Sequence, residues 1–474
     1  MMIKKTVFGL AVVTVIIATP YAGAALTGDE ARAAGFVYGA ENGTVTITGY
    51  TGTAADVAIP GGIDGLPVTT IGEEAFAYCE SLASVTIPDS VTSIGAEAFG
   101  GCAGLASVTI PASVTSIGTG AFGGCASLGT ISVSSANRQY QNADGVLFTR
   151  DGATLHSYPA GSARTVYAIP DGVTAIGEGA FWKSAGLASV TIPDGVTSIG
   201  ENAFFDCDSL ASVTIPASVA HIGTGAFWTC DSLGTISVSS ANRQYLDRDG
   251  VLFTLDGKTL HSVPKGSART AYAIPDGITD IGAGAFYDCD SLGSVTIPDS
   301  VTAIGMNAFF DCDSLVSVTI PYGVIGIGEA AFAYCDSLTS VTIPDSVTGI
   351  GVRAFLYCNN LGSVTIPGSV TSISKNAFWN CASLVSVTIR DGVTSIGEMA
   401  FWNCESLASV SIPDGVTSIG ERAFWNCESL VFITIPASVI SIGAEAFYQC
   451  PLNRATRTDI ERRFGSGQWT VTGQ

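Results

Sequence analysis

The chain has 474 residues, of which 47% are hydrophobic and 13% are charged, so it is long enough for a large core and too apolar for a disordered protein. Aspartate and glutamate outnumber lysine and arginine 41 to 20, which gives a formal net charge of -21 at pH 7. Because such a charge repels phosphate backbones, nucleic acid is excluded as the expected partner.

The first 24 residues have the pattern of an export signal. Lys4 and Lys5 precede a short apolar run, and a small-residue stretch ending at Ala24 fits the cleavage rule. The apolar run, residues 7–18, is shorter than the roughly 20 residues that span a bilayer. We therefore predict a signal peptide at residues 1–24 and an exported protein without a membrane span. It is expected at the cell surface or secreted, with the periplasm as an alternative.

A repeat fills most of the remaining chain. The dipeptide Ala-Phe recurs fourteen times, and eleven of the thirteen intervals between its phenylalanines are 23 residues long while two are 59. A fixed period of this length indicates a solenoid. We predict an N-terminal cap at residues 25–67, a solenoid of 14 units at residues 68–450 and a C-terminal cap at residues 451–474.

One unit, "LASVTIPDSVTSIGAEAFGGCAG" from Leu82, shows how the repeat is expected to fold. The alternation in "SVTI" predicts a strand that buries Val85 and Ile87, and "PDS" predicts a turn after it. Ala98, Phe99 and Cys102 have the spacing of a single helical or 3₁₀ turn. Because one unit buries too little to offset its ordering entropy, the units should stack as one long parallel sheet over a continuous core.

The pattern L-x-x-V-T-I-P-x-x-V-T-x-I-G-x-x-A-F-x-x-C, in register over residues 36–450, resembles the BspA-like class of bacterial leucine-rich repeats. The resemblance implies a leucine-rich-repeat solenoid in an exported or surface protein used for adhesion, with capping segments at both ends. A right-handed parallel β-helix is the alternative fold, since its turns are of similar length. The helical spacing of Ala-Phe-x-x-Cys argues against it.

Two insertions, at residues 134–168 and 239–273, break the period, and the second copies the first at an offset of 105 residues. Both predict hairpins with Asp-Gly turns. The stretch "YLDRDGVLFTLD" in the second copy resembles a calcium-binding loop but lacks the first carboxylate, so a hairpin is favoured. Irregular loops on a rigid scaffold are common recognition sites, so the candidate partner-binding residues here are Arg138, Tyr140, Arg243 and Tyr245.

All 13 cysteines occupy one slot, three residues after the repeat phenylalanine. We expect them to be buried free thiols, with disulfides between rungs or a metal site as alternatives that a linear ladder does not suit. The acids that follow them should form a solvated stripe on the convex edge, with calcium bridging as the alternative: Glu80, Asp208, Asp231, Asp290, Asp313, Asp336, Glu405 and Glu428. No cofactor or metal is predicted.

A second aromatic stripe directly follows the repeat phenylalanines. It lies one step off the buried face, so its rings should be partly exposed, either packing over the convex turn or anchoring a protein or glycan partner. The candidate partner-binding residues in it are Trp182, Trp228, Phe205, Phe310, Trp379, Trp402 and Trp425.

Catalytic signatures are missing from the sequence. It has three histidines, none beside a recognisable nucleophile, and contains neither G-x-S-x-G nor H-E-x-x-H. We therefore predict a non-enzymatic binding protein, an adhesin or attachment factor that presents an extended surface to extracellular proteins or glycans. A passive envelope spacer is the alternative, and a glycan-processing enzyme is a more distant one.

Overall fold

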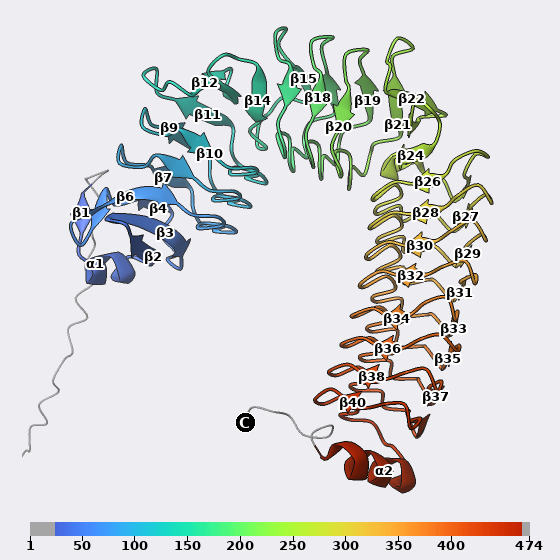
Figure 1. The fold of residues 1–474 in the computed structure, drawn as a ribbon. Coiled ribbons are helices and arrows are strands. Elements are labelled where there is room, and N and C mark those ends of the chain that lie inside the picture. The colour runs from blue at the N-terminus through green and yellow to red at the C-terminus, as the bar shows by residue number, and fades with distance from the viewer. Residues whose placement is uncertain (1–23, 467–474) are drawn as a thin grey trace, which may run out of the picture.

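The computed structural model describes residues 24–466. The predicted signal peptide, apart from Ala24, lies outside the described residues, as do residues 467–474 of the predicted C-terminal cap. The chain winds into a single long solenoid that is bent into an arch, with the two inserted hairpins at its corners (Figure 1). The predicted repeat solenoid is confirmed, whereas the one long sheet that was expected is divided into several.

The "VTI" segments form a parallel ladder, here called the outer ladder, in which equivalent residues of successive rungs pair, as Val364 does with Val387. The inserted hairpins divide it into three sheets of 4, 4 and 8 strands. Its strands are β4 (Asp56–Ala58), β7 (Ser84–Thr86), β9 (Ser107–Ile110), β11 (Thr130–Val133), β15 (Val166–Ala168), β17 (Ser189–Thr191), β19 (Ser212–Ile215), β21 (Thr235–Val238), β25 (Ala271–Ala273), β27 (Ser294–Thr296), β29 (Ser317–Thr319), β31 (Ser340–Thr342), β33 (Ser363–Ile366), β35 (Ser386–Ile389), β37 (Ser409–Ser411) and β39 (Phe432–Thr434).

A second parallel ladder of two-residue strands, the short ladder, forms where each rung returns through its Ser-Ile or equivalent dipeptide. Each of its strands buries its isoleucine and leaves the preceding residue at the surface, except that the last isoleucine is half-buried. The strands are β8 (Ser93–Ile94), β10 (Ser116–Ile117), β16 (Ala175–Ile176), β18 (Ser198–Ile199), β20 (His221–Ile222), β26 (Asp280–Ile281), β28 (Ala303–Ile304), β30 (Gly326–Ile327), β32 (Gly349–Ile350), β34 (Ser372–Ile373), β36 (Ser395–Ile396), β38 (Ser418–Ile419) and β40 (Ser441–Ile442).

The Ala-Phe-x-x-Cys segment is a run of turns, not the helical or 3₁₀ turn that its spacing predicts. In each of the fourteen repeats the residues two before and two after the phenylalanine have positive φ, as Asn202 (51°) and Asp206 (60°) show. The backbone instead bonds to the next rung, since the N–H of Phe204 donates to the carbonyl of Ala226 at 2.8 Å. The rung therefore lacks the feature that argued against a β-helix.

Inside these turns the repeat phenylalanines stack on one another along the solenoid. Phe355 and Phe378 have ring centroids 5.2 Å apart with planes 4° from parallel, an offset stack that adds to the burial of apolar area. The expected burial of the cysteines is also confirmed, since eleven of the 13 are buried and two are half-buried.

The cysteine has a more specific role than filling space. The thiol of Cys381 donates to the carbonyl of Phe355 one rung earlier, with a sulfur-to-oxygen distance of 3.2 Å. Twelve of the 13 cysteines make the same kind of bond to the preceding rung. Burial raises the pKa of Cys381 to about 12, so the thiol keeps the proton that it donates.

The hairpins act as partitions between three separate cores. The first consists of β12 (Tyr140–Ala143), β13 (Val146–Thr149) and β14 (Thr154–Ser157), and the second of β22 (Tyr245–Arg248), β23 (Val251–Thr254) and β24 (Thr259–Ser262). In β13, Leu147 belongs to the N-terminal core while Val146 and Phe148 belong to the central one. The all-apolar "VLF" run is thus a strand buried on both faces, and the expected single continuous core is wrong.

Each hairpin also replaces a missing strand pairing of the short ladder with side chains. The N–H of Ile117 donates to the hydroxyl of Tyr140 at 2.9 Å, and Nε2 of His156 lies 3.0 Å from the Ile117 carbonyl oxygen. The second hairpin repeats the arrangement, with Ile222 donating to the Tyr245 hydroxyl at 3.0 Å. The break in the ladder is therefore hydrogen-bonded at both corners.

The bend places the turns on the inner side of the arch and the outer ladder on its outer side (Figure 1). This corrects the expectation that the turns form the convex edge. The hairpin strands stand between the ladders of the flanking rungs and extend the short ladder, since β14 pairs with β16 and β24 pairs with β26. On the inner side the N–H of Gly124 bonds directly to the carbonyl of Trp182 across the first insertion, at 3.3 Å. The flanking turns therefore stay in contact while extra strands separate the flanking ladders, which bends the solenoid toward the turns.

Both ends of the solenoid carry helices. At the N-terminus the strands β1 (Ala25–Leu26), β2 (Phe36–Glu41), β3 (Thr44–Tyr50), β5 (Gly62–Ile63) and β6 (Leu66–Ile71) lie with α1 (Gly28–Ala33), and near the C-terminus α2 (Arg454–Phe464) packs Ile460 onto the last core. A short 3₁₀ helix, η1 (Lys265–Ser267), follows the second hairpin. No helix within residues 24–466 has the length and hydrophobicity of a membrane span.

The corner histidines predict an acid-sensitive joint. Burial lowers the pKa of His156 and of His261, so both stay neutral in the fold, while an unfolded histidine titrates near 6.5. The free energy of unfolding should fall as pH drops below about 6.5, by up to about 1.4 kcal/mol per histidine for each pH unit. Denaturation of the double variant His156→Gln/His261→Gln at pH 7.5 and 5.5 should show a smaller fall.

The carboxyls of Asp208 and Asp288, whose pKa is raised to about 6, act in the opposite direction because they gain protons more readily when folded. Both aspartates are present in the parent chain and in the double histidine variant. The difference between the two proteins in how the free energy of unfolding depends on pH therefore reports on the histidines alone. Equal profiles would contradict the role given to the imidazoles.

Candidate interaction surface

A second ladder of rings, here called the aromatic ladder, runs along the inner side of the C-terminal arm. Successive ring centroids lie 4.2 to 6.4 Å apart, so each ring contacts the next. All of these rings are half-buried except that of Tyr334, which is exposed. The ladder consists of Trp228, Tyr287, Phe310, Tyr334, Tyr357, Trp379, Trp402, Trp425 and Tyr448.

Two of these rings come from a slot that the sequence pattern did not single out. In two rungs the position after the repeat phenylalanine holds Ala333 or Leu356, and both are buried. The ring is supplied one residue later by Tyr334 and Tyr357, whose centroids are 5.0 Å apart. The sequence does contain these rings, as "FAY" and "FLY". They are recognised as part of the ladder only if the first and second positions after the repeat phenylalanine are considered together.

Trp182 and Phe205 form a separate pair, with centroids 6.4 Å apart. Trp182 lies over the glycine-rich turn of the preceding repeat, where a Cβ on Gly123 would come within 2.4 Å of the indole. Trp228 covers Gly284 across the second insertion in the same way, at 1.9 Å from such a Cβ. These two tryptophans therefore bridge the corners of the arch, and glycine is required beneath them.

The sequence "FWNC" recurs three times in the C-terminal arm and places an amide beside each indole. The side chain of Asn426 donates to Asn403 at 2.6 Å, and Asn380 donates to Asn359 at 2.9 Å, which gives an asparagine ladder parallel to the rings. The guanidinium of Arg422 lies 5.3 Å from the ring centre of Trp425. Half-buried indoles, amides and a guanidinium together are typical of a protein-binding surface.

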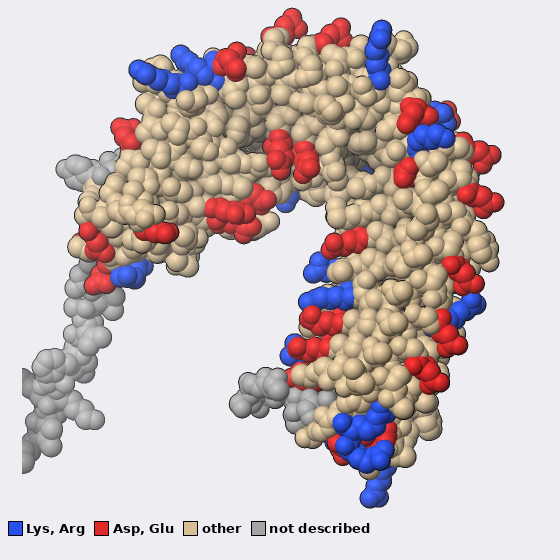
Figure 2. All heavy atoms as spheres, viewed as in Figure 1, with Lys and Arg blue, Asp and Glu red and all other residues tan. Residues whose placement is uncertain are grey.

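The hairpin candidates are divided by the structure. Tyr140 is 8% exposed and Tyr245 is half-buried, and both hydroxyls bond to the short ladder, so these rings are structural parts of the joints. Arg138 and Arg243 are exposed. Figure 2 shows basic side chains gathered over the hairpins, whereas acidic and basic side chains are interspersed along the inner edge of the C-terminal arm.

Two carboxylates of the calcium-like stretch accept backbone hydrogen bonds at the second corner. The Asp247 carboxylate accepts a hydrogen bond from the N–H of Val238 at 2.7 Å, and Asp256 accepts from the N–H of Lys258 at 3.0 Å. Within residues 24–466 no group of three or more histidine, cysteine or acidic side chains is placed to hold a metal ion. Asp247 thus ties the hairpin to β21, and Asp256 stabilises the hairpin turn.

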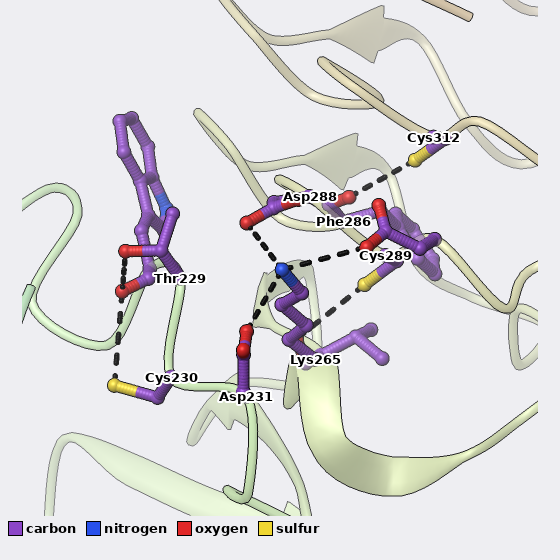
Figure 3. A network of polar contacts seen from close by, with 11 residues as sticks. Thr229, Cys230, Asp231, Lys265, Phe286, Asp288, Cys289 and Cys312 are labelled. Atoms are coloured by element: carbon purple, nitrogen blue, oxygen red, sulfur yellow. Dashed lines mark hydrogen bonds and ion pairs between the residues drawn. The ribbon is translucent and has the colours of Figure 1, made fainter. Parts of the chain in front are cut away.

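One lysine interrupts the acidic stripe at the second insertion. Figure 3 shows the Lys265 ammonium between Asp231 and Asp288, at 2.9 and 2.7 Å, with Asp290 at 3.5 Å. Burial alone would lower the pKa of Lys265, but Asp288 and Asp231 outweigh it and raise that pKa. Burial raises the pKa of Asp288 to about 6 even though Lys265 opposes the shift. The lysine therefore holds crowded carboxylates together.

The first insertion serves as an internal comparison for this cluster. At the same offset of 105 residues, Ala160 stands in place of Lys265 and Lys183 in place of Asp288. The lysine thus occurs at the second insertion, where the flanking rungs carry the aspartates. It is missing at the first insertion, where the flanking rungs lack those aspartates.

Replacing Lys265 by alanine should destabilise the second corner. The change leaves Asp288, whose side chain is 12% exposed, without its partner, and should lower the free energy of unfolding by about 1–3 kcal/mol. Denaturation at pH 7.5 measures the loss, and adding Asp288→Asn to the same chain should recover part of it. Ala160→Ser at the first corner is the matched control and should change little.

Comparisons with known proteins agree with this architecture. The sequence profile of the BspA type leucine rich repeat region matches residues 66–143, 161–248, 265–384 and 325–454. A leucine rich cell surface protein of Faecalibacterium prausnitzii is 35% identical, with 75% of this chain and 92% of that chain covered at a TM-score of 0.50. A leucine-rich repeat protein of Bacteroides ovatus is 27% identical over 88% and 91% of the two chains, with a TM-score of 0.45.

No curated protein matches the chain. The profile nevertheless covers far more than half of the sequence, and the repeat recurs in register with its phenylalanine in all fourteen units and its cysteine in thirteen. The chain therefore belongs to the BspA-type leucine-rich-repeat proteins.

Proposed function

We propose that this chain is an exported, non-enzymatic binding protein of the bacterial cell surface that acts as an adhesin or attachment factor, with the aromatic ladder as its main contact surface. The export pattern at residues 1–24 and the likeness to a surface protein of Faecalibacterium prausnitzii support the location. The observation that carries the binding role is the row of half-buried rings on the inner side of an arch.

The composition of this surface favours a protein partner. Tryptophan, tyrosine and arginine dominate interface energetics, because they bury a large area and also offer a polar group. Trp379, Trp402 and Trp425 stand in consecutive rungs, with centroids 5.5 and 5.0 Å apart. Such a row suits an extended partner that contacts several rungs at once, since repeated weak contacts add up when geometry allows all of them.

The curvature supports the same conclusion. Solenoids commonly use their concave surface for binding, because a partner lying there contacts many repeats. Here the inner side carries the rings, the asparagine ladder and charges of both signs, whereas the outer ladder presents mainly short hydroxyls. Glycans remain the second partner class for this surface.

A passive spacer is the second candidate function, favoured by the contacts that the rings make with each other. Rings that stack across rungs stabilise the solenoid whether or not a partner is present. The two functions differ in one measurable respect: a binding surface loses affinity when its rings are truncated, beyond any loss of stability.

The test is the triple variant Trp379→Ala/Trp402→Ala/Trp425→Ala of the mature chain. Binding to immobilised extracellular-matrix proteins should weaken by about tenfold or more, as expected when interface anchors are removed. The variant Phe432→Ala/Ile440→Ala is the matched control. Both side chains are apolar and exposed, at 63% and 79%, but neither belongs to the aromatic ladder. Its affinity should not change.

Melting temperatures of all three proteins separate binding from stability. A triple variant that melts lower but binds as well as the parent chain contradicts the proposed surface. A parent chain that binds no matrix protein supports the spacer.

A further inference from the structure

The repeats are so uniform that departures from them are informative. Two departures line one groove of the outer ladder, and a third packs against the backbone next to one of them. The residue after the repeat proline is aspartate or alanine in the other repeats, but it is Tyr322 in one and Gly368 in another. The proline itself is replaced by Ser134 and Ser239 where the two insertions begin, and elsewhere only by Arg390. Tyr322 and Arg390 are 68 positions apart in sequence, yet both line the same groove.

The groove crosses three rungs, over β27, β29 and β31. Its volume is about 520 Å³, within the range of roughly 300–1,000 Å³ common for small-molecule sites. Asp299, Thr319, Tyr322, Asp345 and Arg390 line it. It lies on the outer side of the C-terminal arm, away from the aromatic ladder (Figure 1).

Arg390 reaches the groove from two rungs away. Its Nη1 lies 2.8 Å from the carboxylate of Asp345, 45 residues earlier. The intervening rung carries Gly368, where an added Cβ would lie 2.1 Å from the carbonyl oxygen of Asp391. The backbone next to Arg390 thus packs directly on Gly368. Any other residue at position 368 would push that backbone away. Without the proline, the N–H of Arg390 also donates to the carbonyl of Ile366 at 3.1 Å.

The polar groups of the groove match adjacent hydroxyls. The Asp345–Arg390 pair offers an acceptor and a donor side by side, and its side chains are 61% and 54% exposed. A hydroxyl both donates and accepts, so two neighbouring hydroxyls can bond to such a pair at the same time. The exposed hydroxyl of Thr319 offers a further contact on the floor.

The ring of Tyr322 supplies the apolar part. The ring is 78% exposed, so most of its area is not buried by the fold and is open to a ligand. An aromatic face is a good platform for the C–H face of a sugar ring, because its π-electrons attract the weakly positive hydrogens. Two carboxylates against one guanidinium leave the groove negative, which disfavours sulfated, sialylated or uronic sugars.

We propose that this groove binds a short neutral oligosaccharide, with Tyr322 stacking on one sugar ring and Asp345 and Arg390 bonding to its hydroxyls. A peptide is the weaker fit, because β29 is already paired with strands on both sides and the floor is made of hydroxyls, not of apolar pockets. The site is separate from the aromatic ladder, so the two proposals can fail independently.

The mature chain should bind neutral oligosaccharides on an array that also carries sialylated and sulfated ones. Calorimetric titration with the best-bound neutral oligosaccharide should show Tyr322→Ala weakening the affinity by roughly tenfold or more, while Tyr322→Trp stays within about threefold. Arg390→Gln, which keeps the backbone N–H, should also weaken it.

Two matched controls fix the location of the site. Phe432→Ala removes another exposed ring from the outer ladder, and the triple tryptophan variant removes the inner rings, and both should bind the oligosaccharide as the parent chain does. Binding of no neutral oligosaccharide, binding of anionic ones only, or an affinity unchanged by Tyr322→Ala would overturn the proposal. The proposal would also be overturned if no sugar bound and a peptide from a displayed library bound in a way that required Tyr322.

Discussion

Every rung of this protein depends on the next, because a 23-residue unit cannot complete its own hydrogen bonds or its own core. The turn around each repeat phenylalanine bonds outward to the following rung, and the thiol three residues later bonds back to the preceding one. The phenylalanine ring is covered by the rings above and below it. Stability is therefore a property of the interfaces between rungs more than of any single rung.

The same dependence explains the hairpins. An insertion interrupts the stack, so its exposed ends must be covered by something that a rung would have provided. The "VLF" strand closes one core with one face and opens the next with the other, while a tyrosine and a histidine take the hydrogen bonds of the missing short strand. The cost is geometric: covering one side more than the other bends the solenoid into an arch.

The repeat, its strands and its buried positions could be predicted because period and alternation are local properties of the sequence. The shape of the turn could not, because i, i+1, i+4 spacing is also satisfied by turns whose left-handed residues, such as Asn202 and Asp206, bond to the next rung. The direction of the bend was missed for a related reason. It depends on which side of the solenoid the inserted chain joins, and no single segment encodes that.

Among the candidate residues, the aromatic stripe was predictable from its fixed offset after the phenylalanine. Tyr334 and Tyr357 were missed since they complete the ladder from the neighbouring slot. Tyr140 and Tyr245 were selected for standing in irregular loops, but their hydroxyls bond to backbone that is far away in sequence. The groove at Tyr322 requires three rungs to be seen together, which only the fold provides.

The joints at the two corners also have a mechanical consequence. Along each arm, neighbouring rungs share the outer ladder and the turns, and they also share the short ladder except between β32 and β34. At a corner both ladders are interrupted, and a tyrosine hydroxyl and an imidazole take the place of the short one. A load applied between the ends of the arch therefore meets an interruption of both ladders at each corner, whereas the outer ladder is continuous along each arm. The corners are thus built to yield first, and an attached molecule of this kind would lengthen by opening at its bends while its arms, with their rings and groove, stay intact.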